Sequence, residues 1–244
     1  MSDDWATTRF SAFAQLSDVR LAELKELVGP IRHFAKGEVI RDEGDAAQAM
    51  YLLCSGWTAS SMVVAGGARQ IIKVHMPGDL LGLPSLALER AADTLSALTS
   101  VTLLTVEPRA LGRLFEVSPH LTALLFLISQ EERVMLMDRL ASLGRTDATA
   151  RLTALVLQLH ARVLRNNPQA GATFEVPLTQ ENLADLTGLT EVHVNRTIKK
   201  LRASKVLRWS RRWITIVDEA ALRELAGLPE RKLATDLSWI PADQ

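Results

Sequence analysis

The sequence has very little cysteine: Cys54 is the only one in 244 residues. A single thiol excludes a disulfide within the chain, and it excludes a zinc site built from four thiolates of one chain. Because Cys54 lies in an apolar run, we interpret it as a buried strand residue. We predict no metal site.

The sequence also has no excess of either charge, since 28 Lys and Arg balance 28 Asp and Glu. Any affinity for nucleic acid must therefore come from a local basic patch. Long apolar runs are missing too: no stretch approaches the roughly 18 to 20 apolar residues of a membrane span, and the N-terminus lacks the pattern of a signal peptide. We expect a cytoplasmic protein with no membrane partner.

Motifs of the common enzyme classes are absent. The sequence contains no phosphate-binding glycine loop, no HExxH and no nucleophile elbow. The neighbouring polar residues Glu131-Glu132 and Glu181-Asn182 are interpreted as solvated side chains on helix faces. The prediction is that the protein is not an enzyme.

The N-terminal half carries the signals of a short helix followed by many short strands. Ser17 can cap a helix that ends at Gly29-Pro30. From Ile31 to about Val106 apolar runs, the last of them a predicted strand from Ser96 to Val106, alternate with glycine-containing turns. Gly66-Gly67, between two such runs, is the strongest hairpin signal. With 48% hydrophobic residues, the chain is long enough for two domains, and the short strands of this half predict an antiparallel roll or barrel.

A long helix is predicted to begin at Ser118-Pro119 and to end where Gly144 breaks the pattern. Its apolar residues follow alternating three- and four-residue steps, which is typical of a helix that pairs with another helix. Glu132 interrupts the seam and is predicted to lie near a dimer axis or to face the sensor. The predicted dimer interface consists of Leu121, Leu125, Ile128, Glu132, Leu136 and Leu140. The alternative is that the same stripe is buried within one chain.

The stretch from Leu178 to Leu207 predicts two short helices joined by a tight turn. Thr179 and Thr190 each stand where a hydroxyl can cap a helix, and Gly188 can take the left-handed conformation that a turn requires. The spacing is that of a helix-turn-helix motif. The alternative is a solvated amphipathic helix pair in an unrelated domain.

The second of these helices carries a basic outward face. Between Thr190 and Trp213 there are eight Lys or Arg against one acid, Glu191. Such a patch attracts the phosphate backbone of DNA, and a β-hairpin with Arg211 and Arg212 at its tip follows as a predicted wing. The predicted DNA-binding residues are Thr179, Gln180, Thr190, Glu191, Val192, His193, Asn195, Arg196, Lys199, Lys200, Arg211 and Arg212.

Three segments of the chain match motifs of a known family. They are AMYLLCSG (49–56) with HMPGDLLG (75–82), then RTDATARLTALVLQL (145–159), and LTQENLADLTGLTEVHVNRTIKKL (178–201). These segments resemble the cyclic AMP receptor protein and fumarate-nitrate regulator (Crp/Fnr) family of bacterial transcription factors. The resemblance covers residues 15 to 228 and implies a homodimer in which each recognition helix contacts half of a near-palindromic promoter site. It also implies RNA polymerase as a partner.

The resemblance departs from the family where cyclic AMP would bind. Cyclic AMP binders have a glutamate directly after the glycine that Gly82 matches, and an Arg-Ser pair about eleven residues further on; here these places hold Leu83 and Asp93-Thr94. A carboxylate at the place of the phosphate repels the ligand, so cyclic AMP is disfavoured. The predicted effector pocket consists of Gly82, Leu83, Ser85, Arg90, Asp93 and Thr94.

Other cofactors of the family are disfavoured as well. One cysteine cannot ligate an iron-sulfur cluster within one chain. His75 beside Met76 could ligate haem, but a single histidine in a β-roll more often forms hydrogen bonds with its neighbours. The cofactor is therefore left unknown: a different small effector and no effector at all both stay open.

The family often presents a glutamate two residues after the cap of the recognition helix, where this chain has Val192. We therefore expect a different base preference: Arg196 contacts a guanine, Val192 a thymine methyl, and Asn195 or His193 adds a further bond.

Together these observations predict an α+β protein and a sequence-specific transcriptional regulator that binds double-stranded DNA. Residues 1–117 form a cyclic-nucleotide-binding-like β jelly roll with an N-terminal helix, 118–144 a dimerisation helix, and 145–244 a winged helix-turn-helix domain. The competing hypothesis is a cyclic-nucleotide-binding-like module that acts through protein–protein contacts.

Overall fold

The computed structural model describes residues 9–46, 49–227 and 229–242. The chain divides into two compact units. The first, here called the roll unit, comprises Met1–Val63, Ile72–Glu132 and Lys232–Gln244, and the second, the helix-turn-helix unit, comprises Val64–Ile71 and Arg133–Arg231. The domain limits at 117 and 144 stay a prediction.

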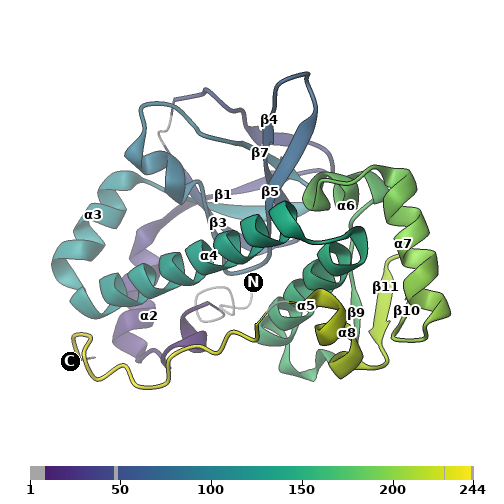
Figure 1. The fold of residues 1–244 in the computed structure, drawn as a ribbon. Coiled ribbons are helices and arrows are strands. Elements are labelled where there is room, and N and C mark those ends of the chain that lie inside the picture. Colours follow the sequence, from purple (N-terminus) through teal and green to yellow (C-terminus); the bar gives the residue numbers. More distant parts are fainter. Residues whose placement is uncertain (1–8, 47–48, 228, 243–244) are drawn as a thin grey trace. The chain divides into compact units, whose positions relative to one another are not determined.

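The roll is antiparallel, as the sequence predicted, and it consists of two four-stranded sheets (Figure 1). One sheet has the order β1-β8-β3-β6 and the other the order β2-β7-β4-β5. The strands are β1 Val28–Phe34, β2 Val39–Arg41, β3 Met50–Ser55, β4 Thr58–Val63, β5 Arg69–His75, β6 Leu80–Leu81, β7 Thr94–Ala97 and β8 Val101–Val106. Leu53, Leu81 and Leu103 of the first sheet pack with Leu95 of the second, so the core lies between the sheets.

Glycine geometry fixes one corner of the roll. Gly56 has φ +83° between β3 and β4, and a Cβ atom on it would lie 2.3 Å from the Ser100 carbonyl oxygen. Only glycine fits so close an approach of two backbone segments.

The limits of three predicted elements were wrong. The first helix, α2 Asp18–Leu27, ends before Gly29-Pro30, which lie in β1. Proline is tolerated there because β1 is the edge strand of its sheet and because its pairing with β8 shifts register between Val28 and Ile31. The single strand predicted over 96–106 is two strands, and Gly144 lies inside the long helix.

Helices cover the first sheet of the roll with a second apolar cluster. The sequence-based interpretation had missed one of them, α3 Pro108–Val117, which begins with Pro108 in its first turn and buries Leu111 and Leu114. These two leucines belong to a cluster that also contains residues from the first part of α4 Pro119–Arg145, from α2 and from the short helix η1 Phe10–Ala12. The cluster ties the N-terminal segment and α4 to the roll.

The helix-turn-helix unit is built on α5 Ala148–Asn166, whose buried face carries Leu152, Val156 and Leu159. Three helices pack against it: α6 Gln180–Thr187, α7 Glu191–Ala203 and α8 Glu219–Ala226. Asp147 caps this helix, since its side chain accepts a hydrogen bond of 2.8 Å from the Ala150 amide. No helix among the described residues is long and apolar enough to cross a membrane.

Candidate nucleic-acid interface

The first helix of the motif, α6 Gln180–Thr187, begins with a reciprocal cap. The Thr179 Oγ1 accepts from the Asn182 amide and the Asn182 Oδ1 accepts from the Thr179 amide, both at 3.1 Å. Two backbone donors are thereby satisfied, which fixes where α6 starts. The sequence predicted the threonine but not its amide partner.

The turn after α6 has the geometry that the glycine predicted. Gly188 lies in the left-handed region with φ 63° and ψ 34°, and the Leu189 amide donates to the Ala184 carbonyl at 3.1 Å. A side chain at this position would be strained by the backbone and would approach Leu143 to 3.3 Å. The direction of the next helix is set by this turn.

The second helix, α7 Glu191–Ala203, begins at the predicted cap. The Thr190 Oγ1 accepts from the His193 amide at 3.3 Å and lies 3.1 Å from the His193 Nδ1, so the imidazole is held against the cap. Val194 and Leu201 are buried, whereas Ile198 is half-buried. Thr197 shares the buried face and donates to the His193 carbonyl at 2.9 Å.

The other face of α7 is exposed and carries most of the predicted contact residues. Exposed along it are Glu191, Val192, His193, Asn195, Arg196, Lys199 and Lys200. The Lys200 ammonium donates to Thr149 Oγ1 at 3.3 Å, so this cation is turned towards the start of α5. Val192 is 67% exposed on an otherwise polar surface, which is the kind of apolar contact point that a thymine methyl can cover.

The wing is a three-stranded sheet rather than the predicted two-stranded hairpin. Strands β10 Leu207–Ser210 and β11 Trp213–Ile216 pair around the two-residue loop Arg211-Arg212, and β9 Thr173–Glu175 pairs with the other edge of β11. Both arginines of the loop are exposed. The Arg212 guanidinium lies 3.3 Å from the Glu175 carboxylate, and Arg211 has a φ of 53°, unusual for a residue with a side chain.

The predicted effector residues do not all lie together. Gly82 precedes the short helix η2 Leu83–Ala87, in which Ser85 is buried, and Ser85 and Asp93 both contact Arg41, which the sequence analysis had missed. Arg90 lies apart from them, exposed, and donates to the Gly44 carbonyl at 2.9 Å. Thr94 opens β7, where its hydroxyl accepts from the Glu43 amide at 3.0 Å.

The predicted dimer residues divide into two groups. Leu121 and Ile128 are buried in the chain's own apolar cluster, so they correspond to the alternative of an intramolecular core stripe. Glu132 pairs with Lys73 and, at 3.3 Å, with Arg9, so its carboxylate faces the roll. Leu125 is half-buried, whereas Leu136 and Leu140 are exposed. Only the second half of the predicted seam is open to a partner.

The histidine considered for haem lies in a polar pair. The buried His75 Nε2 lies 2.7 Å from the Ser60 hydroxyl, and its Nδ1 lies 3.7 Å from the Asp79 carboxylate. An axial ligand needs one of these nitrogens facing an open volume. Both point at protein groups instead, so the residues present do not fit haem.

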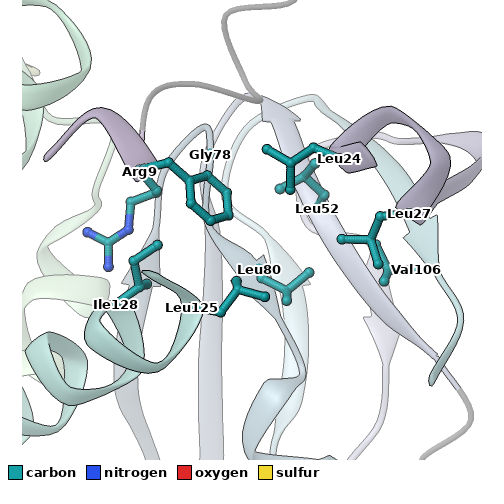
Figure 2. A pocket seen from close by; sticks show the side chains of 10 residues that line it. Arg9, Leu24, Leu27, Leu52, Gly78, Leu80, Val106, Leu125 and Ile128 are labelled. Atoms are coloured by element: carbon teal, nitrogen blue, oxygen red, sulfur yellow. The ribbon is translucent and has the colours of Figure 1, made fainter. Parts of the chain in front are cut away.

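A small apolar cavity lies in the roll unit (Figure 2). It measures about 30 Å³ and is lined by Arg9, Phe10, Leu24, Leu27, Leu52, Gly78, Leu80, Val106, Leu125 and Ile128. This volume is that of one or two water-sized molecules, far below the few hundred Å³ of an ordinary ligand pocket. The cavity therefore does not supply a site for a nucleotide-sized effector.

The single thiol is expected to be unreactive. Cys54 lies in a strand as predicted, but it is half-buried rather than buried. This partial burial raises its pKa from 9.0 to about 11, so the neutral thiol predominates at pH 7 to 8. We expect the native protein to react with a maleimide far more slowly than a free cysteine does, and the rate to keep rising up to about pH 11. In the presence of an oxidant, the Cys54→Ser variant and the wild type should bind DNA with the same affinity. Rapid labelling at pH 7 would contradict the burial of this thiol.

An antiparallel roll and a winged helix-turn-helix with an exposed basic face define a class: regulators that join a nucleotide-binding-like domain to a DNA-binding domain. Comparisons with known proteins agree. The sequence model of the Crp-like helix-turn-helix domain matches residues 150–225, and that of the cyclic nucleotide-binding domain matches residues 31–118. The chain belongs to the Crp/Fnr family of DNA-binding transcription regulators.

Similar proteins cover nearly the whole chain. The nitrogen fixation regulation protein FixK of Bradyrhizobium diazoefficiens is 28% identical over 216 residues, which are 88% of this chain and 90% of that protein. The fumarate and nitrate reduction regulatory protein of Vibrio cholerae is 24% identical over 87% of this chain and 85% of its own. The solved structure of FixK2 from Bradyrhizobium japonicum superposes with a TM-score of 0.75 at 23% identity, over 84% of this chain and 100% of that one.

Proposed function

We propose that the protein binds double-stranded DNA as a homodimer and regulates transcription from a near-palindromic promoter site. The observation that carries this proposal is the exposed face of α7, on which amide and cationic side chains lie together above a buried apolar face. A helix of this kind fits the major groove, and the wing beside it brings two further cations to the phosphates. One such helix contacts one half of the site.

The dimer is supported by an exposed apolar surface on α4. Phe126, Met137 and Leu140 are 55%, 60% and 73% exposed, and Leu136 lies one turn before Leu140. Large apolar side chains in one stretch of a single helix are costly in water and are typical of a helix that pairs with another. A second copy of α4 is the partner proposed for this surface, because most soluble homo-oligomers are two-fold symmetric dimers in which the same surface of each chain is paired.

Base specificity is assigned to three side chains on the exposed face of α7. Arg196 is proposed to donate two hydrogen bonds to a guanine edge, and Val192 to contact a thymine methyl. Asn195 is proposed to pair with an adenine edge. His193 is held by the cap, so we assign it a phosphate rather than a base.

The DNA-bound dimer is proposed to alter the rate of transcription by contacting RNA polymerase. Whether the result is activation or repression depends on where the site lies relative to the promoter. Native mass spectrometry of the purified protein with a duplex tests the stoichiometry: we expect two chains per duplex. A complex with one chain at saturating protein would contradict the proposal.

A prediction for the wing follows from the strained backbone at its tip. Arg211 has φ 53°, a conformation that glycine adopts without cost. Arg211→Gly should remove roughly 1 to 2 kcal/mol of left-handed strain, which offsets the larger backbone entropy that glycine loses on folding. We therefore expect no loss of stability, while DNA binding weakens on all sequences alike. The measurements are thermal unfolding and binding isotherms over a range of salt concentrations.

The salt dependence decides whether the wing contacts phosphates. Loss of one phosphate contact should lower the slope of log affinity against log salt by about 1. Arg212→Ala is the comparison variant, with a smaller effect expected because Glu175 already neutralises part of its charge. An unchanged slope in Arg211→Gly would rule out this contact.

A further inference from the structure

The roll unit contains one buried guanidinium in the region that matches cyclic nucleotide-binding domains. Arg41 stands at the end of β2, and its side chain is only 6% exposed. A buried cation must be paired with an anion, because leaving water costs several kcal/mol. A buried guanidinium can bind an anionic group that comes either from a ligand or from the chain itself.

The anion that Arg41 contacts belongs to the chain itself. Its Nη2 donates to the Asp93 carboxylate at 2.6 Å and to the Ser85 hydroxyl at 3.2 Å. The Ser85 hydroxyl also lies 3.5 Å from the same carboxylate and accepts from the Ala92 amide at 3.2 Å. The carboxylate of Asp93 is thus held at a site of converging donors.

The backbone of Gly82 packs against the guanidinium of Arg41. A Cβ atom on Gly82 would lie 2.7 Å from the Arg41 Nη1, so the guanidinium packs directly on this residue, which has φ +81°. Within the described part of the chain, the buried Nε and Nη1 of Arg41 have no hydrogen-bond acceptor. The guanidinium therefore has donors to spare beyond those that Asp93 uses.

We propose that Asp93 is a built-in anion: its carboxylate occupies the site formed by Arg41, Ser85 and Gly82, so that the protein binds DNA without a cyclic nucleotide. The proposal rests on the DNA-binding function proposed above. A phosphate from solution would have to displace a tethered carboxylate, and if it did not, two anions would share one guanidinium. The residues present do not fit a cyclic nucleotide.

The first arm of the test uses the wild-type protein. Its melting temperature and its affinity for a selected duplex should be the same with and without millimolar cyclic AMP or cyclic GMP. Acetate or inorganic phosphate should have no effect beyond that of sodium chloride at equal ionic strength. Saturable stabilisation of the wild type by a nucleotide or by phosphate would overturn the proposal, because it would show an open site.

The second arm removes the built-in anion. Asp93→Ala should melt on the order of 5 to 10 °C lower than the wild type, because Arg41 loses its partner. Acetate or phosphate at tens of millimolar should recover a large part of this loss, whereas chloride at equal ionic strength should not. The matched control is Asp42→Ala, which removes an exposed carboxylate next to Arg41 in sequence and should melt and respond to anions like the wild type.

A conservative variant keeps the test decisive if Asp93→Ala does not fold. Asp93→Asn preserves the shape and one acceptor, so it should fold, melt lower than the wild type and be stabilised by acetate or phosphate. If neither variant responds to these anions, the site does not bind anions and the proposal fails. Failure of the wild type to bind any duplex would instead sink the proposed function, and the melting data would still decide the role of Asp93.

Discussion

Leu140→Glu should convert the protein into a monomer and weaken its binding to a palindromic site by about 10²- to 10⁴-fold, which is the advantage that joining two binding units confers. Leu140 is 73% exposed within the chain, so the substitution should hardly affect folding of the monomer. In a dimer that pairs through α4, the same change would place a charge in an apolar interface. Sedimentation and binding isotherms measure the two effects.

The control for this variant is Leu88→Glu, which makes the same change of charge at a leucine of the roll that is 53% exposed. It should remain dimeric and bind DNA as the wild type does. A Leu140→Glu protein with dimer mass and unchanged affinity would show that α4 does not form the interface.

Arg196→Ala should weaken binding to the preferred site by roughly 5- to 150-fold, the equivalent of about 1 to 3 kcal/mol, and should relax selectivity at one base position. Arg196 is exposed on α7, so little stability should be lost. The measurement is affinity for the preferred duplex, for the four variants of the contacted base pair and for a random duplex.

The comparison variant for Arg196 is Lys199→Ala, on the same exposed face of α7. A lysine that contacts phosphates contributes equally on every sequence, so this variant should lose affinity without changing base preference. If Arg196→Ala also loses the same factor of affinity for preferred and for random duplexes, Arg196 contacts the DNA backbone and not a base.

The helix-turn-helix motif could be predicted from the sequence because its determinants are local. Thr179, Gly188 and Thr190 each act on backbone groups within three or four residues, and the structure shows all three in the predicted roles. Likewise, Gly66-Gly67 marked the hairpin between β4 and β5. Contacts between residues only a few positions apart in the sequence can be predicted without knowledge of the tertiary fold.

Features that depend on distant partners could not be predicted in the same way. Arg41 and Asp93 are 52 positions apart, and nothing near either residue shows that they meet. Strand β9 was missed for the same reason, since its three residues become a strand only by pairing with β11. Long-range pairing of this kind is set by the fold as a whole.

The long helix shows a limit of periodicity itself. Leu121, Ile128 and Leu140 follow one seam in sequence, but the first two are buried in the chain's own cluster and the third is exposed. Periodicity predicts that a face is buried, not whether the covering surface belongs to the same chain.

Selection from random duplexes, followed by binding of the recovered sequence across a range of salt concentrations, tests the central claim most directly. A homodimer that inserts two copies of α7 should enrich a near-palindrome whose half-sites lie about one helical turn, ~10 base pairs, apart, without any added nucleotide. Its affinity for this site should exceed that for random DNA at every salt concentration. Recovery of no common sequence, with binding that depends only on salt, would contradict the account.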